Sequence, residues 1–272
     1  MFGGRILSPN TIKLYESNLK RLNNGELPSS PVFLKNTAAI EKKIEKYSTN
    51  TKKSYYITIV SYLKDKKVPK KLLKHYTDIM DNMNKSYRET SGEKTETQEK
   101  NWMEWSDVVA HYNTLPSNSL DRLVLSLFVL QPPRRSKDYF LMKVVPKYNE
   151  DMSKDFNYYD GDKMYMNNYK TNKTYGTQII DVPNELVSVI QSYYPMKGNF
   201  EPFFLLQKDG KPLAENGITR ILNRSFGKNI SSSMLRNIYL SSKYQGTEKA
   251  MDKDAKAMGT SKDMLSNVYT KR

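Results

Sequence analysis

The chain has 272 residues, with 44 Lys and Arg against 29 Asp and Glu, a formal net charge of +15 and a pI near 9.5. This excess favours a polyanionic partner, and 38% hydrophobic residues suffice for buried cores in about two domains. Because there is no Cys and there are only two His, we exclude disulfides, thiolate catalysis and Cys-based zinc sites, and expect no metal and no cofactor. No window resembles a membrane span or a signal peptide, so we expect an intracellular protein without membrane contact, located wherever its partner is.

Residues 1–90 carry a net charge of +10, two thirds of the excess. The densest basic run lies between positions 64 and 71 and contains Lys64, Lys66, Lys67, Lys70 and Lys71. Such a run suits phosphate contacts and counterion release. A solvated helix end or a nuclear-import signal would give the same pattern.

Residues 1–88 are predicted to form a helical domain, because apolar or Tyr residues recur at helical spacing over 11–22, 51–63 and about 69–83. We expect these Tyr residues to pack in the core rather than to stack on bases or sugars. Residues 89–101 are polar and lack an apolar period, which predicts a linker. A second domain, residues 102–272, is expected to begin with a helix that Ser106 caps.

The second domain is predicted to be mixed. A strongly apolar helix over 120–130 ends at Pro132-Pro133. Residues 163–169 and 177–182 read as two strands of a hairpin around a polar turn. Helices are predicted at about 184–193, 215–226, 231–243, 247–257 and 261–269. The expected fold class is therefore mainly α with a small β-sheet, an α+β second domain preceded by a helical one.

Arg is used sparingly, at ten of the 44 basic positions. Arg134 and Arg135 directly follow the apolar helix, and Arg236 stands within an apolar helical segment. The planar guanidinium matches paired phosphate oxygens better than an ammonium group does. Pairing with a structural carboxylate is the alternative for each site.

Five short segments occur in an informative order. They are Arg135-x-x-Asp138 after the Pro pair, Lys170 with Lys173 in the hairpin turn, Ser233-x-x-Arg236, Gly259-Thr260, and Tyr269 near the end. Together they resemble the boxes of the tyrosine recombinase (phage integrase) family, over residues 102–272. The helical segment 1–88 is similar to that family's core-binding domain.

The resemblance implies an enzyme that cleaves and rejoins double-stranded DNA without metal or cofactor, as a dimer or tetramer on its target. Tyr269 would form a covalent 3′-phosphotyrosine, and Arg135 and Arg236 would bind the non-bridging oxygens. Lys170 would be the general acid, with Lys173 as the competing candidate. Arg134, Lys173 and the five lysines of the basic run would contact DNA.

The sequence departs from the family's pattern at two positions where a His is usual. Ser233 and Thr260 occupy these positions and can donate hydrogen bonds to phosphate, but they cannot act as bases near neutral pH. Only three residues follow Tyr269, where many members have a segment that docks on a neighbouring subunit.

Two other functions fit the same residues. A type IB topoisomerase uses nearly the same chemistry, although the form of the first box favours a recombinase. A non-catalytic DNA-binding protein on a degenerate scaffold would also lack both His residues, although it would not be expected to keep Arg135, Lys170, Arg236 and Tyr269. Abundant Lys, Asn, Ile and Tyr are typical of an AT-rich coding sequence, such as that of a large DNA virus or a mobile element.

Overall fold

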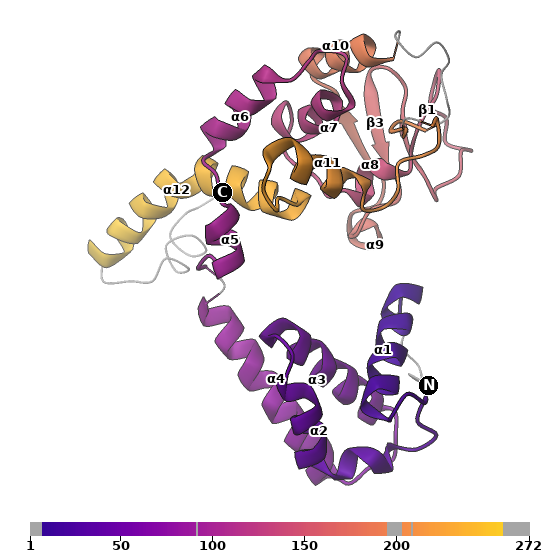
Figure 1. The fold of residues 1–272 in the computed structure, drawn as a ribbon, viewed down its shortest axis with the longest axis vertical. Helices are drawn as coiled ribbons and strands as arrows, with labels where there is room; N and C mark the ends of the chain where they lie inside the picture. The colour runs from indigo at the N-terminus through magenta and orange to yellow at the C-terminus, as the bar shows by residue number, and fades with distance from the viewer. Residues whose placement is uncertain (1–6, 91, 195–202, 208, 258–272) are drawn as a thin grey trace. The chain divides into compact units, whose positions relative to one another are not determined.

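A computed structural model describes residues 7–90, 92–194, 203–207 and 209–257. By its internal contacts the chain divides into two compact units, Met1–Lys94 and Thr95–Arg272, called here the first and second units. Figure 1 shows their elements, which are mostly helices with one small sheet. The predicted mainly α fold with a small β-sheet is thereby confirmed at the level of secondary structure. Within these ranges no helix combines the length and apolarity that crossing a membrane requires.

The first unit is helical throughout its described part, with α1 (Pro9–Leu22), a 3₁₀ turn η1 (Pro31–Lys35), α2 (Thr37–Glu45), α3 (Thr49–Lys64) and α4 (Lys70–Thr90). The Ser8 side chain accepts a hydrogen bond from the Thr11 amide at 3.2 Å and caps α1, which therefore starts at Pro9, two residues before the predicted range of 11–22. Tyr55, Tyr62 and Tyr76 are at most 1% exposed, which confirms the predicted core position for these three, while Tyr15 is half-buried against the same core. The Tyr76 hydroxyl donates to the Leu34 carbonyl at 2.8 Å and so satisfies its buried polar end.

The segment expected to be a linker, residues 89–101, contains regular structure. Helix α4 continues to Thr90, and α5 occupies Glu96–Asn101. Thr95 and Gln98 form a capping box, in which the Gln98 amide donates to Thr95 Oγ1 at 3.3 Å and the Thr95 amide donates to Gln98 Oε1 at 2.9 Å. Capping hydrogen bonds stabilise a short polar helix without any apolar period, which is why periodicity missed it.

The helices of the second unit after α5 are α6 (Trp105–Thr114), α7 (Leu120–Val129), α8 (Lys137–Phe140), α9 (Asn172–Tyr175), α10 (Asn184–Tyr193), α11 (Gly217–Phe226) and α12 (Ser232–Ala257). Helix α7 packs against α6, α10, α11 and α12, and Figure 1 shows it surrounded by these elements. Leu123, Val124, Leu127 and Phe128 are all 0% exposed, as expected for a helix that is apolar on every face.

Helices α6 and α12 also differ from the sequence prediction. Helix α6 begins at Trp105 after Glu104, so Ser106 lies inside the first turn and is not the cap. The segments 231–243 and 247–257 form one continuous helix, α12, because Gly246 weakens a helix without ending it. The helix predicted at 261–269 lies outside the described residues.

The sheet has four strands in the order β1-β2-β3-β4: Met142–Val144, Asn157–Tyr159, Lys163–Met166 and Gln178–Asp181. Strands β1 and β2 are parallel, and the other neighbours are antiparallel. The pairing of β3 with β4, with Met164 opposite Ile180, confirms the predicted hairpin, although its turn contains α9. The sequence pattern does not predict strands β1 and β2, since three residues are too few to show alternation.

Candidate functional site

The segment after α7 folds back over the end of that helix. Gln131 is buried, and its amide nitrogen donates to the Tyr139 hydroxyl at 3.0 Å and to the Leu127 carbonyl at 3.4 Å. The two prolines that follow cannot continue the helix. The chain therefore turns at the edge of the apolar core and presents Arg134 and Arg135 just before α8.

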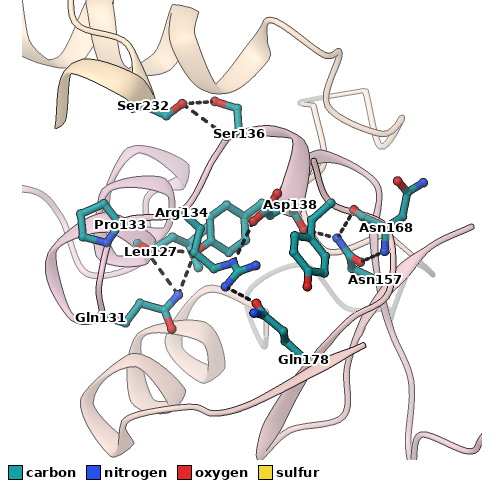
Figure 2. Close-up of polar contacts among 12 residues, drawn as sticks. Leu127, Gln131, Pro133, Arg134, Ser136, Asp138, Asn157, Asn168, Gln178 and Ser232 are labelled. Atoms are coloured by element: carbon teal, nitrogen blue, oxygen red, sulfur yellow. Dashed lines mark hydrogen bonds and ion pairs between the residues drawn. The ribbon is translucent and has the colours of Figure 1, made fainter. Parts of the chain in front are cut away.

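Arg134 is engaged within the protein (Figure 2). Its Nε donates to Asp138 Oδ2 at 2.8 Å, and its Nη1 donates to Gln178 Oε1 at 3.1 Å. Its guanidinium carbon lies 5.4 Å from the centroid of the Tyr169 ring. Arg134 thus joins the segment after α7 to the β3–β4 hairpin.

Asp138 is a buried carboxylate, with a side chain only 3% exposed. Burial raises the pKa of this carboxyl, and the positive charges of Arg134, Arg135 and Arg236 oppose that rise. Its Oδ1 atom has no hydrogen-bond donor among the described residues. The acidic residue of the first sequence box is therefore ion-paired with Arg134 and also lies in the electrostatic field of Arg135 and Arg236.

Arg236 enters the same place from α12, about one hundred positions further along the chain. Its Nε donates to the Pro133 carbonyl at 3.1 Å. Burial lowers the pKa of Arg236, and the nearby positive charge of Arg135 lowers it further, while Asp138 opposes both effects. No described residue forms an ion pair or hydrogen bond with the guanidinium of Arg135, which leaves its donors available to a ligand.

A pair of serines fixes the start of α12 against this segment. Ser232 is 7% exposed, and its Oγ lies 2.8 Å from Ser136 Oγ and accepts from the Ser136 amide at 3.3 Å. Figure 2 shows this contact beside the Arg134 network. The hydrogen bonds set the position of α12, and hence of Arg236, relative to Arg135.

These groups surround a hollow of about 360 Å³, the arginine pocket. Its lining comprises Gln131, Pro132, Pro133, Arg134, Arg135, Asp138, Tyr169, Thr171, Tyr175, Gln178, Ile180 and Arg236. The pocket is built from the α7–α8 segment, the hairpin and α12. Three guanidiniums and one carboxylate give it a positive balance, which suits an anion.

The structure brings together some of the predicted site residues and leaves others apart. Arg134, Arg135 and Arg236 line the arginine pocket, whereas Lys170 and Lys173 are exposed in the hairpin turn and do not line it. Ser233 is exposed on α12, and its buried neighbour Ser232 makes the contact with Ser136. Thr260 and Tyr269 lie outside the described residues.

The predicted DNA-contacting lysines of the basic run belong to the first unit. Lys64 ends α3, and Lys70 and Lys71 begin α4. Lys64, Lys67, Lys70 and Lys71 are exposed, while Lys66 is half-buried with its Nζ 5.5 Å from the centroid of the Tyr62 ring. The run therefore spans the connection between two helices rather than the face of one.

Three pocket residues escape prediction from the sequence. Gln178 holds Arg134, Gln131 has an acceptor oxygen without a donor among the described residues, and Tyr175 is a 66% exposed hydroxyl-bearing side chain. Gln131 carries a usable signal, because a polar residue directly after a fully apolar helix needs a buried partner. Gln178 and Tyr175 carry none, since their role depends on how the hairpin folds against α8.

Comparisons with known proteins add nothing to this geometry, because the chain matches no protein-family model and no curated protein sequence. In the part of the chain that the structure describes, no group of three or more His, Asp or Glu is placed to bind a metal ion. Function is therefore inferred from the residues of the site.

Proposed function

We propose that this chain is a DNA strand transferase of the tyrosine recombinase type, which cleaves and rejoins DNA through a covalent 3′-phosphotyrosine. The observation that carries the proposal is the meeting of Arg135 and Arg236 in one pocket. These two residues come from segments far apart in the chain, and the sequence motifs in which they stand independently predict that they act together. A site-specific recombinase or integrase requires that pair at the scissile phosphate.

Electrostatics supports an anionic ligand at this place. Arg135 lowers the pKa of Arg236, so the two positive charges disfavour one another, and the single carboxylate of Asp138 is shared with Arg134. A phosphodiester between Arg135 and Arg236 would relieve this repulsion. Bidentate guanidinium–phosphate hydrogen bonds would also fix the orientation of the phosphate.

In the proposed reaction, the Tyr269 hydroxyl oxygen attacks the phosphorus, its proton passes to a water molecule, and the bond from phosphorus to the 5′ oxygen breaks. The leaving 5′ oxygen takes a proton, which Lys170 or Lys173 supplies from the hairpin turn. Arg135 and Arg236 stabilise the charge that develops on the non-bridging oxygens. Attack by a 5′ hydroxyl on the phosphotyrosine reverses the sequence and joins the strands, so no external energy source is consumed.

Lys170 is the stronger candidate for the general acid because its two neighbours, Tyr169 and Thr171, both line the arginine pocket. Its ammonium group is exposed and has no partner among the described residues. Bending of the hairpin turn over bound DNA would place this group near the phosphate. Joining two duplexes requires two cleavage sites, so we propose that the active form on DNA is a dimer or tetramer.

The test is covalent attachment to DNA in the presence of EDTA. Purified protein is incubated with nicked duplexes carrying candidate target sequences, separated under denaturing conditions, and the adduct is mapped by mass spectrometry. We expect an adduct at Tyr269, linked to a 3′ phosphate, that Tyr269→Phe abolishes while duplex binding stays within about twofold, because a single hydroxyl is removed and the backbone contacts that dominate affinity remain.

Tyr175→Phe is the matched control, since Tyr175 is the exposed hydroxyl that the structure places at the arginine pocket. It should keep the adduct. An adduct that survives Tyr269→Phe and disappears in Tyr175→Phe would move the nucleophile to the hairpin and would falsify the role of Tyr269. If neither the wild type nor any variant forms an adduct while DNA binding is intact, the proposed strand transfer is wrong and the chain is a non-catalytic DNA-binding protein.

A further inference from the structure

A second hollow, of about 290 Å³, lies entirely within the first unit and is called here the lysine pocket. It is formed by the last turns of α1 and α2 and by α3, and is lined by Arg21, Leu22, Asn24, Lys42, Lys43, Lys46, Tyr47 and Tyr55. Four of these eight residues are cationic and none is acidic. The basic run at 64–71 contributes no residue to it.

One of the four cations has a structural partner. The Lys43 Nζ donates to the Leu22 carbonyl and to Asn24 Oδ1, both at 2.8 Å. It thereby satisfies a carbonyl at the end of α1 and offsets the partial negative charge there. Lys43 therefore holds α1 against α2, and its charge is already used within the protein.

The other three cations remain available. No described carboxylate pairs with Arg21, Lys42 or Lys46, and all three side chains are exposed. The neighbouring Tyr55 hydroxyl raises the pKa of Arg21, so the guanidinium stays charged beside that ring. The Lys46 Nζ lies 5.4 Å from the centroid of Tyr47, whose ring is 5.1 Å from that of Tyr55.

We propose that the lysine pocket binds one phosphate group of the DNA backbone, which Arg21, Lys42 and Lys46 surround. Three like charges around one hollow repel each other until an anion enters, and guanidinium and ammonium donors are the groups that bind phosphate. The inference rests on the proposed function in one respect, because that function identifies the bound polyanion as DNA. The exposed cations leave the phosphate open to solvent on one side, where the rest of a nucleic-acid strand would continue.

A different role for these lysines makes a different prediction. Basic side chains in the last turn of a helix stabilise it without any ligand, because they offset the partial negative charge at the helix end. If that were their only role, replacing them would lower the melting temperature and leave DNA affinity unchanged. Stability and DNA binding therefore have to be measured on the same variants.

The test compares two charge-matched double variants of the full chain. Lys42→Gln/Lys46→Gln removes two cations of the lysine pocket, and Lys35→Gln/Lys74→Gln removes two exposed cations of the same unit elsewhere. Anisotropy of labelled duplexes of unrelated sequence is measured over a range of salt concentrations. We expect the pocket variant to bind all duplexes more weakly and its salt slope to become shallower by about one, the value for one lost phosphate contact.

The control variant should keep the wild-type slope, and equal losses in both variants would mean diffuse attraction and overturn the proposal. Inorganic phosphate is the second probe. If it raises the melting temperature of the wild type but not of the pocket variant, while DNA binding is the same for both, the pocket serves a free phosphate compound instead of DNA. Covalent attachment is a separate readout, so a protein that binds DNA through this pocket and forms no adduct refutes the proposed catalysis alone.

Discussion

At the scale of single residues, two adjacent arginines have different surroundings. The sequence predicts phosphate contact for Arg134 and catalysis for Arg135. In the structure, Arg134 donates to Asp138 and to Gln178, while the guanidinium of Arg135 has no hydrogen-bond partner among the described residues. We therefore expect Arg134 to position the hairpin and the carboxylate, and Arg135 to meet the ligand.

Replacing Arg134 tests this division. Arg134→Met would leave the buried Asp138 carboxylate without its main partner, which typically costs about 3–5 kcal/mol of the free energy of unfolding. Adding Asp138→Asn should recover part of that loss, because no uncompensated charge would remain in the pocket wall. Urea titration followed by circular dichroism measures the stability of both variants. If the double variant recovers no stability, the broken Arg134–Asp138 ion pair is not what destabilises Arg134→Met.

The decrease in the free energy of unfolding caused by Arg134→Met should also depend on pH. Burial raises the pKa of Asp138 in the folded protein, and the charge of Arg134 opposes the rise. The stability contribution of a carboxyl with a raised pKa is complete below its unfolded value of about 4 and is lost as pH rises through the folded pKa. Without Arg134 the folded pKa rises further, so the stability gap between wild type and Arg134→Met should widen as pH rises from the folded pKa of Asp138 in the wild type to its higher folded pKa in the variant.

At the scale of elements, α12 is the longest helix in the described ranges, and it begins at the serine contact that fixes it against the arginine pocket. Its buried apolar residues, Met234, Leu235 and Ile238, all lie in the first two turns. From Leu240 onward its described side chains are exposed almost throughout. Helical propensity, rather than packing, must therefore stabilise its second half.

A pair of glycine substitutions examines that conclusion. At Gly246 in α12 an added Cβ meets nothing within 4 Å, so Gly246→Ala should stabilise the protein by roughly 0.5–1 kcal/mol through reduced backbone entropy. At Gly227, after α11, the space is equally open but φ is +61°, so Gly227→Ala should destabilise by about 1 kcal/mol. Thermal denaturation measures both, and destabilisation by Gly246→Ala would indicate that α12 is interrupted there, as the sequence pattern predicts.

At the scale of the whole molecule, most of the basic excess and the arginine pocket fall on different units. The net charge of +10 on residues 1–90 lies in the first unit, and the arginine pocket lies in the second. The first unit has its own core, in which Leu19, Leu34, Ile59 and Leu63 are fully buried. A unit with its own core is expected to fold without the other.

A fragment of residues 1–94 should therefore fold and bind DNA without acting on it. We expect a cooperative thermal transition, affinity for duplex that falls steeply with salt, and no covalent adduct, since the arginine pocket is absent. Affinity that does not change with salt would show that the basic excess serves another purpose. The full chain with Arg236→Gln is the reference, because it keeps the first unit intact and loses one guanidinium of the pocket.

Several features follow from the sequence because each depends on neighbours along the chain. The apolar period and the following prolines locate α7, the alternation of Met164 and Met166 locates the hairpin, and the rarity of Arg draws attention to Arg135 and Arg236. Local patterns cannot supply α5, which capping hydrogen bonds stabilise, or the three-residue strands β1 and β2.

Only the tertiary structure decided which charges meet. The sequence does not reveal that the side chains of Arg134 and Ser232 form hydrogen bonds within the protein, while those of Arg135 and Ser233 form none among the described residues. The lysine pocket likewise unites residues of α1, α2 and α3 whose sequence pattern is that of ordinary solvated helix ends. Charge and propensity are properties of a segment, whereas the partner of a charge is set by packing between segments distant in the chain.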